Sequence, residues 1–589
     1  MKDKNLFFYL RGWLWLRRTA QPTEVQWNLL FAAVVGVMGA MLGLIFKEAT
    51  VALRALMSGV ALSSEAAFAQ MPWWQCIAIP TFGGILAGLV IAVGRKYIRQ
   101  KPTEYLEAIR LGDGRLPVRA SLYQSLASLL SIASGTAIGR EGPLVQLSAL
   151  GASLLGMWRK FPPARRRLLV ACGAAAGIAA AYNAPIAAAL FVSEITVGSL
   201  AMESLGPLLF ASVASIVTVH IFSDASPLYR LDHFALPRWS ELFFFCVMGI
   251  VCGLMAGIFL VMLKQVKHWF HQLPGPLALK MGLGGAVVGG IALFHPEVTG
   301  NGYDALKSLL NGTAALGVDQ VLWNAVLLIL LARMVATSTA FGSGAVGGVF
   351  TPTLVVGACT GSLCWFALAR MFPDMQFDQA GFATIGMGAV LAAATQAPFM
   401  SILMIFEMTL SYEIMIPLML ASVIAYYTFR GLRVHSLYHH EQPDTHDLSH
   451  RPLESLTVAD IMQKEPRTIG LAARFGEVAA NFLAGGLDRQ YVVGPKHKLI
   501  GVIRLEDLAE HLHSRSLADA FIAGDIVHDN PTALDSTSPL PEALVIFTHE
   551  HEHTLPVLRP GTKELAGTLS RNDLLLTLAE AGKRPGTKR

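Results

Sequence analysis

Two adjacent charges stand alone in a long apolar stretch of this sequence. Arg140 and Glu141 are the only charged residues between Arg119 and Arg159. Residues 139–143 read Gly-Arg-Glu-Gly-Pro, so glycines flank the pair and a proline follows it. Proline suits the first turn of a helix, and a helix N-terminus offers free backbone N–H groups and a partial positive charge. Such a terminus can bind an anion, and the tethered Glu141 carboxylate would compete with that anion.

A second glycine-rich segment has the same character. Residues 342–352 read Gly-Ser-Gly-Ala-Val-Gly-Gly-Val-Phe-Thr-Pro and lead into apolar sequence. Two helix N-termini facing one site would attract an anion without a full positive charge, and binding would stay weak enough for release. The structural alternatives are a buried Arg140–Glu141 pair that joins two helices, a loop at the membrane interface, and glycines that serve close helix packing.

The composition places these segments in a membrane protein. The chain has 589 residues, of which 53% are hydrophobic and 15% charged, with a net charge of +5. From Glu441 onward 37 of 149 residues are charged, against 50 in the first 440. Such a composition excludes a disordered chain, a nucleic-acid module and a simple cytosolic enzyme. It predicts a membrane body at 27–440, with a cytoplasmic segment 1–26, and a soluble tail of domain size.

Some apolar stretches predict simple membrane spans and others predict broken helices. Residues 27–46 and 242–263 are uncharged and long enough to cross the bilayer. Residues 171–193 contain Asn183 and Pro185, and the uncharged stretch 334–369 contains the glycine-rich segment. Broken helices within a membrane are tolerated where the backbone faces protein or a polar cavity. This pattern is typical of a transporter or channel.

An internal repeat predicts two homologous halves, at about 27–222 and 238–430. Residues 179–196 align without gaps to residues 392–409, with 8 of 18 positions identical. The matches include Pro185 with Pro398 and Glu194 with Glu407. Repeats of this kind usually place the substrate site at their interface, near the bilayer midplane.

Taken together, these motifs resemble those of the CLC chloride channels and antiporters. Residues 139–143 are similar to the family's GREGP motif, and residues 348–352 to its GxFxP motif with the usual Ser-Gly-Ala lead-in. Residues 181–185 and 436–438 also fit. The resemblance covers about residues 30–440 and is strongest to a bacterial branch of the family. It implies an all-α polytopic membrane fold with two inverted repeats of tilted and broken helices, and a homodimer with one anion pathway per subunit.

The resemblance also implies roles for particular residues. Glu141 corresponds to the gating glutamate, which blocks the outer anion site when it is ionised. Tyr438 corresponds to the tyrosine whose hydroxyl contacts the central anion. The implied anion-binding residues are Gly139, Arg140, Glu141, Gly142, Val349, Phe350 and Tyr438.

Two departures from the family pattern bear on selectivity and coupling. The family's GSGIP motif, whose serine contacts the central anion, is absent, and its expected place is residues 101–107 with Thr103 as the nearest replacement. Proton-coupled members carry an internal glutamate in a pattern like FIIEE, and here that position is Ile195. An aliphatic side chain carries no proton, which favours a channel. Glu194 and Glu407 are the nearest candidates for a proton path, and their structural alternative is hydrogen bonding at helix ends.

The tail resembles a pair of CBS domains, which form small α/β folds. After a polar linker at 441–456, the two units span about 457–515 and 522–582, followed by a basic tail at 583–589. In nucleotide-binding CBS pairs a G-x-x-[ST]-x-x-D turn holds phosphate and ribose. Only the second unit has that pattern, with Ser570 and Asp573, because the first has Arg504 in place of the serine. The alternatives are adenine nucleotide binding and a purely structural role.

Other polar clusters give weaker signals. His549, His551 and His553 stand at spacing two, which could form a metal site or a pH sensor, although a polar turn between helix and strand is the simpler interpretation. The six cysteines lie in apolar stretches and we interpret them as buried apolar residues. No nucleophile–base pair or metal cluster predicts an enzyme. No cofactor is expected, chloride is the substrate, and adenine nucleotide binding at the CBS pair is left open.

The sequence therefore leaves three functional hypotheses. The first is passive chloride transport through a voltage-gated-like channel with a glutamate gate. The second is proton-coupled antiport with an altered inner proton path, and the third, from another class, is a CBS-regulated cation transporter. Chloride, nitrate and fluoride are not distinguished. The basic residues before the first apolar run predict a cytoplasmic N-terminus. With the resemblance to bacterial members of the family, we expect a bacterial inner-membrane protein with both termini in the cytoplasm.

Overall fold

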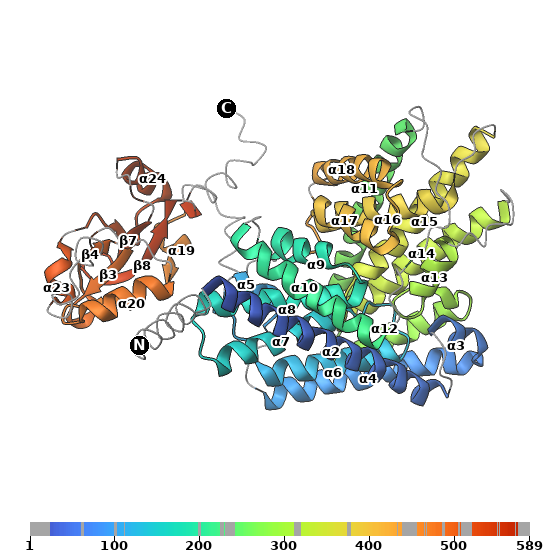
Figure 1. Ribbon diagram of the computed structural model, residues 1–589, viewed down its shortest axis with the longest axis horizontal. Helices are drawn as coiled ribbons and strands as arrows, with labels where there is room; N and C mark the ends of the chain where they lie inside the picture. The colour runs from blue at the N-terminus through green and yellow to red at the C-terminus, as the bar shows by residue number, and fades with distance from the viewer. Residues whose placement is uncertain are drawn as a thin grey trace, which may run out of the picture. The chain divides into compact units, whose positions relative to one another are not determined.

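The chain forms two units, Met1–His439 and His440–Arg589, which are described separately (Figure 1). The computed structural model describes residues 24–59, 64–98, 103–110, 112–197, 202–223, 229, 242–310, 320–373, 378–432, 434–438, 456–464, 466, 468–485, 489–504, 507, 521–529, 531–549, 552, 554–571 and 573–574.

The regular elements of the first half of the membrane unit are all helices among the residues that the structure describes. Its elements are α2 (Glu24–Ser58), α3 (Ser64–Gln70), α4 (Trp73–Tyr97), α5 (Tyr105–Arg110), α6 (Val118–Ala133), α7 (Glu141–Trp158), α8 (Pro163–Tyr182), α9 (Pro185–Phe191), the π-helix η1 (Val192–Val197) and α10 (Met202–Phe222).

The second half is also helical and lies beside the first, in green to orange in Figure 1. Its elements are α11 (Leu242–Gln272), α12 (Leu277–Ala292), the 3-10 helix η3 (Pro296–Val298), α13 (Tyr303–Leu310), α14 (Gln320–Gly342), α15 (Phe350–Met371), α16 (Gln379–Thr395), α17 (Pro398–Thr409) and α18 (Met415–Gly431).

Six of the described helices are long and apolar enough to cross a membrane, namely α2, α4, α10, α11, α14 and α15. The two predicted spans at 27–46 and 242–263 lie within longer helices, α2 and α11. Many large apolar side chains of these helices face outward, as expected for a protein surrounded by lipid. The predicted helical membrane body is confirmed.

The helix break predicted from Asn183 and Pro185 is present, and the aligned segment of the second half is broken in the same way. Helix α8 ends before Asn183, whose φ of 56° lies in the left-handed region, and α9 begins at Pro185. Helix α16 ends before Gln396, with φ 59°, and α17 begins at Pro398. A left-handed residue stops each first helix, and the following proline starts the next one, since it lacks an N–H to leave unpaired.

Glycines hold the helix pairs behind the broken segments in close contact. A Cβ on Gly173 of α8 would lie 2.7 Å from the Ser148 carbonyl oxygen of α7. A Cβ on Gly357 of α15 would lie 2.7 Å from the Met387 Cα of α16. Small residues let helix backbones approach in this way in membranes, where association depends on packing. The two close contacts pack α7 against α8 and α15 against α16.

The tail contains two four-stranded sheets of a small α/β fold. The first CBS-like segment supplies α19 (Val458–Ile461), β1 (Gln463–Lys464), β2 (Thr468–Gly470), α20 (Phe475–Gly485), β3 (Arg489–Val493), the 3-10 helix η6 (Pro495–His497) and β4 (Leu499–Arg504). The second supplies α23 (Ala523–Ile526), β5 (His528–Asp529), β6 (Leu534–Asp535), α24 (Leu540–His549), β7 (Thr554–Leu558) and β8 (Leu565–Ser570).

The two CBS-like segments exchange edge strands. The sheet orders are β1-β8-β7-β6 and β2-β3-β4-β5, so β1 pairs antiparallel with β8 and β5 with β4. Each segment opens on the same local structure, because Asp460 accepts a hydrogen bond from the Thr457 N–H and Asp525 from the Ile522 N–H. The exchange makes each sheet depend on both segments.

Candidate anion site

The two glycine-rich segments meet in the membrane unit. Gly139 and Gly348 form an antiparallel bridge, with N···O distances of 2.7 Å and 2.9 Å for the two backbone hydrogen bonds. Helix α7 begins two residues later at Glu141, and α15 begins two residues later at Phe350. The bridge therefore brings together two helix N-termini from different halves, whose first N–H groups have no partner within their own helices.

The Glu141 carboxylate is buried between these two segments. The residue is 5% exposed, and the Thr351 hydroxyl donates a hydrogen bond to its Oε1. A Cβ on Gly139 would collide with the Glu141 carboxylate, and one on Gly348 would lie 3.0 Å from Oε2. Oε2 accepts no hydrogen bond from the residues that the structure describes. The carboxylate thus fills a space that only glycine leaves open, beside two helix starts.

Aromatic side chains from four segments lie around the Glu141 carboxylate. The Tyr182 hydroxyl lies 3.2 Å from the Thr351 Oγ1, and its ring centroid lies 4.9 Å from that of Phe350. Phe191 lies between Phe350 and Tyr438, with centroid distances of 6.2 Å and 5.3 Å. A backbone hydrogen bond of 2.9 Å from the Leu437 N–H to the Ala394 carbonyl oxygen holds the Tyr438 segment against α16. The structure therefore places the predicted residues Phe350 and Tyr438 in one cluster of aromatic side chains.

Arg140 points away from the carboxylate. Its guanidinium lies over the Tyr303 ring, 5.3 Å from the centroid, and lines a separate cavity. Arg140 and Glu141 are both described and form no ion pair with each other. The alternative of a buried Arg140–Glu141 pair that joins two helices is therefore wrong.

Gln146 organises the segment where the family serine is missing. Its Oε1 accepts a hydrogen bond of 3.0 Å from the Tyr105 N–H, and its Nε2 donates one of 3.0 Å to the Thr103 carbonyl oxygen. Helix α5 begins at Tyr105, so Thr103 lies just before another helix start. The side chain of Gln146, on α7, links this third helix N-terminus to the helix that carries Glu141.

Each of the two glutamates matched by the repeat caps a helix start in the other half of the membrane unit. Glu194 accepts a hydrogen bond of 3.0 Å from the Met400 N–H at the start of α17. Glu407 accepts hydrogen bonds of 2.9 Å and 2.8 Å from the N–H groups of Ile186 and Ala187 at the start of α9. These contacts are those of the structural alternative, in which buried acids bind helix ends. Ile195 is buried, and its carbonyl oxygen accepts a hydrogen bond from Arg110.

The candidate nucleotide residues of the tail are engaged with each other and with β1. The Ser570 hydroxyl accepts a hydrogen bond of 3.1 Å from the Asp573 N–H, and the Gln463 side chain donates one of 3.3 Å to the Asp573 carboxylate. In the first unit, Arg504 lies 3.2 Å from Glu552, and its N–H donates to Asp507. The two turns therefore have different polar surroundings.

The histidine cluster falls largely outside the described residues. Helix α24 ends at His549 and β7 begins at Thr554, so the cluster occupies the connection between a helix and a strand. His551, His553 and the side chain of His549 are not described. Among the described residues no group of three His, Cys, Asp or Glu side chains could hold a metal ion.

Comparisons with known proteins agree with this geometry. A family model described as voltage gated chloride channel matches residues 82–430, more than half of the chain. The chain belongs to this family. A CBS-domain model matches the CLC protein's tail at residues 458–514 and 523–580. The cation-transporter hypothesis does not account for the first match.

The membrane unit of this CLC protein is similar to named bacterial proteins. It is 42% identical over 415 residues to a ClcB-like chloride channel protein of Ralstonia nicotianae, covering 70% of this chain and 95% of that one. It is 36% identical over 417 residues to the voltage-gated ClC-type chloride channel ClcB of Escherichia coli, covering 70% and 97%.

Solved structures of the family are also similar to this chain. A slow cyanobacterial Cl−/H+ antiporter matches with a TM-score of 0.60 and 27% identity, over 70% of this chain and 96% of that one. A eukaryotic CLC transporter matches with a TM-score of 0.59 over 93% of this chain and 97% of that one. Its 15% identity makes it evidence for the fold alone.

Three residues of the site were missed by sequence reasoning. Thr351 stood inside the second motif, Tyr182 inside the segment 181–185, and Gln146 five residues after Glu141. The first two could have been singled out, because a hydroxyl beside a helix start in a membrane needs a polar partner. Gln146 carried no signal, since its partners lie 25 to 43 residues away in the chain.

Proposed function

We propose that this protein carries chloride across a membrane through a pathway that the ionised Glu141 carboxylate closes. The observation that carries the proposal is the position of that carboxylate, buried beside the bridge between Gly139 and Gly348 and beside two helix starts. Oriented backbone N–H groups and helix dipoles favour negative charge there. A carboxylate and a chloride ion would compete for this one place.

Protonation of Glu141 would open the pathway. A neutral carboxyl group gains less from the positive helix termini than a carboxylate does, so it leaves the place to chloride. The Thr351 hydroxyl, which donates to Oε1, favours the ionised and seated state. Opening therefore depends on competition between the tethered Glu141 carboxylate and a free chloride ion for the same site. Acid and chloride both shift this competition toward the open state.

The anion would be held weakly on its way through. We propose that backbone N–H groups near Arg140 and Gly142, and near Val349 and Phe350, bind chloride, and that the Tyr438 hydroxyl binds the central anion. No full positive charge is needed, and conduction requires binding that also permits release. Arg140 contributes its backbone here, because its side chain lies over Tyr303.

We propose a passive channel in preference to an antiporter. Ile195 takes the position of the proton-carrying glutamate and is buried without a titratable group. The carboxylates of Glu194 and Glu407 bind backbone N–H groups at helix starts. The antiporter remains the second candidate because the solved structure at 27% identity is of a Cl−/H+ antiporter.

Simultaneous recording of chloride and pH separates these candidates. Purified protein in liposomes, with a tenfold chloride gradient and a clamped membrane potential, should pass chloride without a sustained pH change. Sustained proton pumping that Glu141→Gln abolishes would make the protein an antiporter. The absence of chloride flux in liposomes that contain folded protein would contradict the proposed function.

We propose that the protein works as a homodimer in a bacterial inner membrane, with both termini in the cytoplasm. The dimer is what the family resemblance implies, and α10 and α18 present outward-facing apolar side chains that a partner could cover, among them Phe210, Val213, Met419 and Val423. Cysteine cross-linking between these helices in native membranes tests the dimer, and labelling of either end tests the orientation.

We also propose that the second CBS unit is where an adenine nucleotide would bind. Ser570 and Asp573 are adjacent there, and Asp573 would accept the ribose hydroxyls in place of the Gln463 amide. Calorimetry with ATP should show that Asp573→Ala weakens binding, whereas Asp507→Ala in the first unit has a smaller effect. Equal ATP affinity in the wild type and Asp573→Ala would rule out this site.

A further inference from the structure

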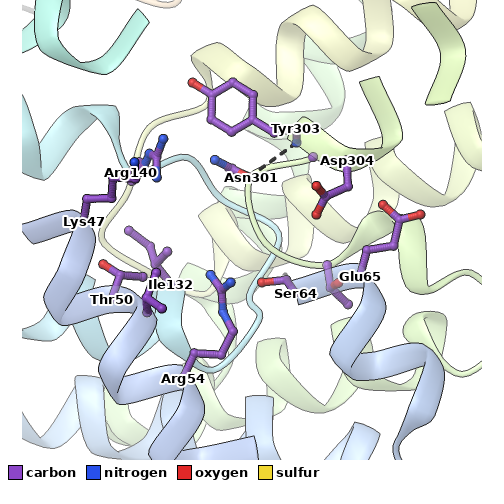
Figure 2. Close-up of a pocket in the computed structure, with 13 residues that line it drawn as sticks. Lys47, Thr50, Arg54, Ser64, Glu65, Ile132, Arg140, Asn301, Tyr303 and Asp304 are labelled. Carbon is purple, nitrogen blue, oxygen red and sulfur yellow. Dashed lines mark hydrogen bonds between the residues drawn. The ribbon is translucent and has the colours of Figure 1, made fainter. Parts of the chain in front are cut away.

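A polar cavity lies on the far side of Arg140 from the anion site. Its volume is about 140 Å³, well above the roughly 10–15 Å³ that a cavity needs in order to hold one water molecule. The lining comes from α2, α3, the end of α6, the loops before α7 and α13, and α13 itself (Figure 2). Its charged residues are Lys47, Arg54, Glu65, Arg140 and Asp304.

Two guanidinium groups supply unused donors to this cavity. Figure 2 shows Arg54 reaching from α2 toward the loop of Asn301, with Arg140 on the other side of that space. The Nε atoms of both arginines are buried and donate to none of the residues that the structure describes. Buried donors normally have a partner, so these two are suited to water or to an anion.

The acids of the cavity leave the cations unpaired. Glu65 and Asp304, which are both described, form no ion pair with Lys47, Arg54 or Arg140. Three cations and two ionised carboxylates give the cavity a net charge of +1. Protonation of Glu65 would raise that charge to +2 and strengthen the field on an anion.

We propose that this cavity is an outer binding subsite for a small monovalent anion such as chloride, in which Arg54 holds the ion and Glu65 controls occupancy. The proposal rests on the proposed function, since the ion bound here is the one that next meets Glu141. Arg140 joins the two places, because its backbone lies beside the Glu141 gate and its side chain lines the cavity.

The surroundings of Glu65 make its control sensitive to pH near neutrality. Burial, together with the nearby carboxylates of Asp304 and Glu297, raises the pKa of Glu65 to about 7, against the opposing effect of Arg333. Glu297 itself lies 3.8 Å from His295, and Arg333 donates to the carbonyl oxygens of Val298 and Gly300. Below pH 7 Glu65 is neutral and anion binding is strongest, and above pH 7 the carboxylate weakens binding.

The cavity lies toward the C-terminal end of α2. Helix α2 begins at Glu24, and Lys47 and Arg54 stand toward its other end, about 35 to 45 Å along the axis at ~1.5 Å per residue. With the N-terminus in the cytoplasm, the subsite faces the exterior. The relevant variables are therefore external chloride and external pH.

The experiment measures chloride flux in liposomes as external chloride is varied, at pH 6 and pH 8, with Glu141→Gln present in every protein to keep the gate open. Arg54→Gln should raise the half-saturating external chloride concentration by about threefold or more, as expected for the loss of one nearby unit charge. Lys307→Gln is the matched control, because Lys307 is exposed on α13 and does not line the cavity.

The role of Glu65 is tested in the same assay. With Glu65 present, the half-saturating concentration should be higher at pH 8 than at pH 6, and Glu65→Gln should remove that difference. Glu48→Gln, at an exposed position of α2 outside the cavity lining, should preserve it.

Two results would overturn the proposal. One is an Arg54→Gln protein whose half-saturation matches that of Lys307→Gln, and the other is a pH difference that survives Glu65→Gln. The gate proposal has a separate readout, because it concerns the maximal flux at saturating chloride. A Glu141→Gln protein whose maximal flux keeps the wild-type pH dependence would contradict the gate and leave the subsite test intact.

Discussion

The two halves of the membrane unit share a scaffold but differ at the helix starts that meet. Each half has a helix stopped by a left-handed residue, a proline-started helix, and a glutamate that caps the other half. At the glycine bridge the first half presents the Glu141 carboxylate and the second presents the Thr351 hydroxyl, and the two form a hydrogen bond. The matched features belong to the scaffold, and the unmatched pair of Glu141 and Thr351 is the part to which we assign the proposed gate.

In the proposed mechanism, this difference explains why a single carboxylate, that of Glu141, is enough to close the site. Two helix starts create a site that either an anion or a carboxylate can fill. A second carboxylate from the other half would repel the first at short distance and would leave no place for chloride. A hydroxyl group instead stabilises the seated carboxylate without adding charge.

The largest effect should come from filling the space that Gly139 leaves for the carboxylate. Gly139→Ala would force the Glu141 carboxylate out of its place, because the new methyl group would collide with it. Chloride flux at alkaline pH should rise about tenfold, a change that corresponds to ~1.4 kcal/mol in the gating equilibrium. Liposome flux measured at pH 8 gives the comparison with the wild type.

The double variant Gly139→Ala/Glu141→Ala tests whether Gly139→Ala acts through the Glu141 carboxylate. The nearest atoms to the added methyl group all belong to the Glu141 side chain, so Gly139→Ala should change nothing further in a Glu141→Ala protein. An effect of the same size in both backgrounds would show that the glycine serves the bridge to Gly348 and not the seat of the carboxylate.

A smaller effect should come from the hydroxyl of the second half. Thr351→Val keeps the shape of the side chain and removes the donor to Glu141, so the ionised state loses a hydrogen bond to a charged group. The midpoint of acid-induced opening should move to higher pH by about half a unit. Thr353→Val is the matched control, since that buried hydroxyl donates to the Val349 carbonyl oxygen instead. Equal midpoints in the two variants would argue against a role of Thr351 at the gate.

The smallest effect on transport should come from the symmetric pair. Glu194→Gln and Glu407→Gln each weaken a cap on the opposite half, and each should cost about 1–2 kcal/mol of stability while flux persists. Thermal unfolding in detergent should show similar losses for both. A variant that kept full stability and abolished chloride-driven proton movement would identify its glutamate as a proton carrier.

Much of the scaffold could be predicted from the sequence because it depends on local chemistry. Asn183 and Pro185 indicated a helix break, the glycine-rich segment indicated a gap between two helices, and the aligned prolines indicated a repeat. Each of these features acts over a few residues of backbone. The resemblance to the CLC family then gave the fold and the position of the tail.

The contacts across the site could not be predicted in the same way. The bridge between Gly139 and Gly348 joins residues 209 positions apart, and the hydrogen bond from Thr351 to Glu141 spans 210. The direction of the Arg140 side chain also depends on Tyr303, which lies in the other half. The exchange of edge strands in the tail had no local signal either, because β1 and β5 are two residues long.

The most direct test of the account is the external pH dependence of chloride flux in Glu141→Gln at saturating chloride. The wild type should pass more chloride as external pH falls, since protonation frees the outer anion place. Glu141→Gln should pass chloride at the same high rate from pH 5 to pH 8, because the amide cannot be ionised. A Glu141→Gln protein that retained the pH dependence of the wild type would show that Glu141 is not the gate.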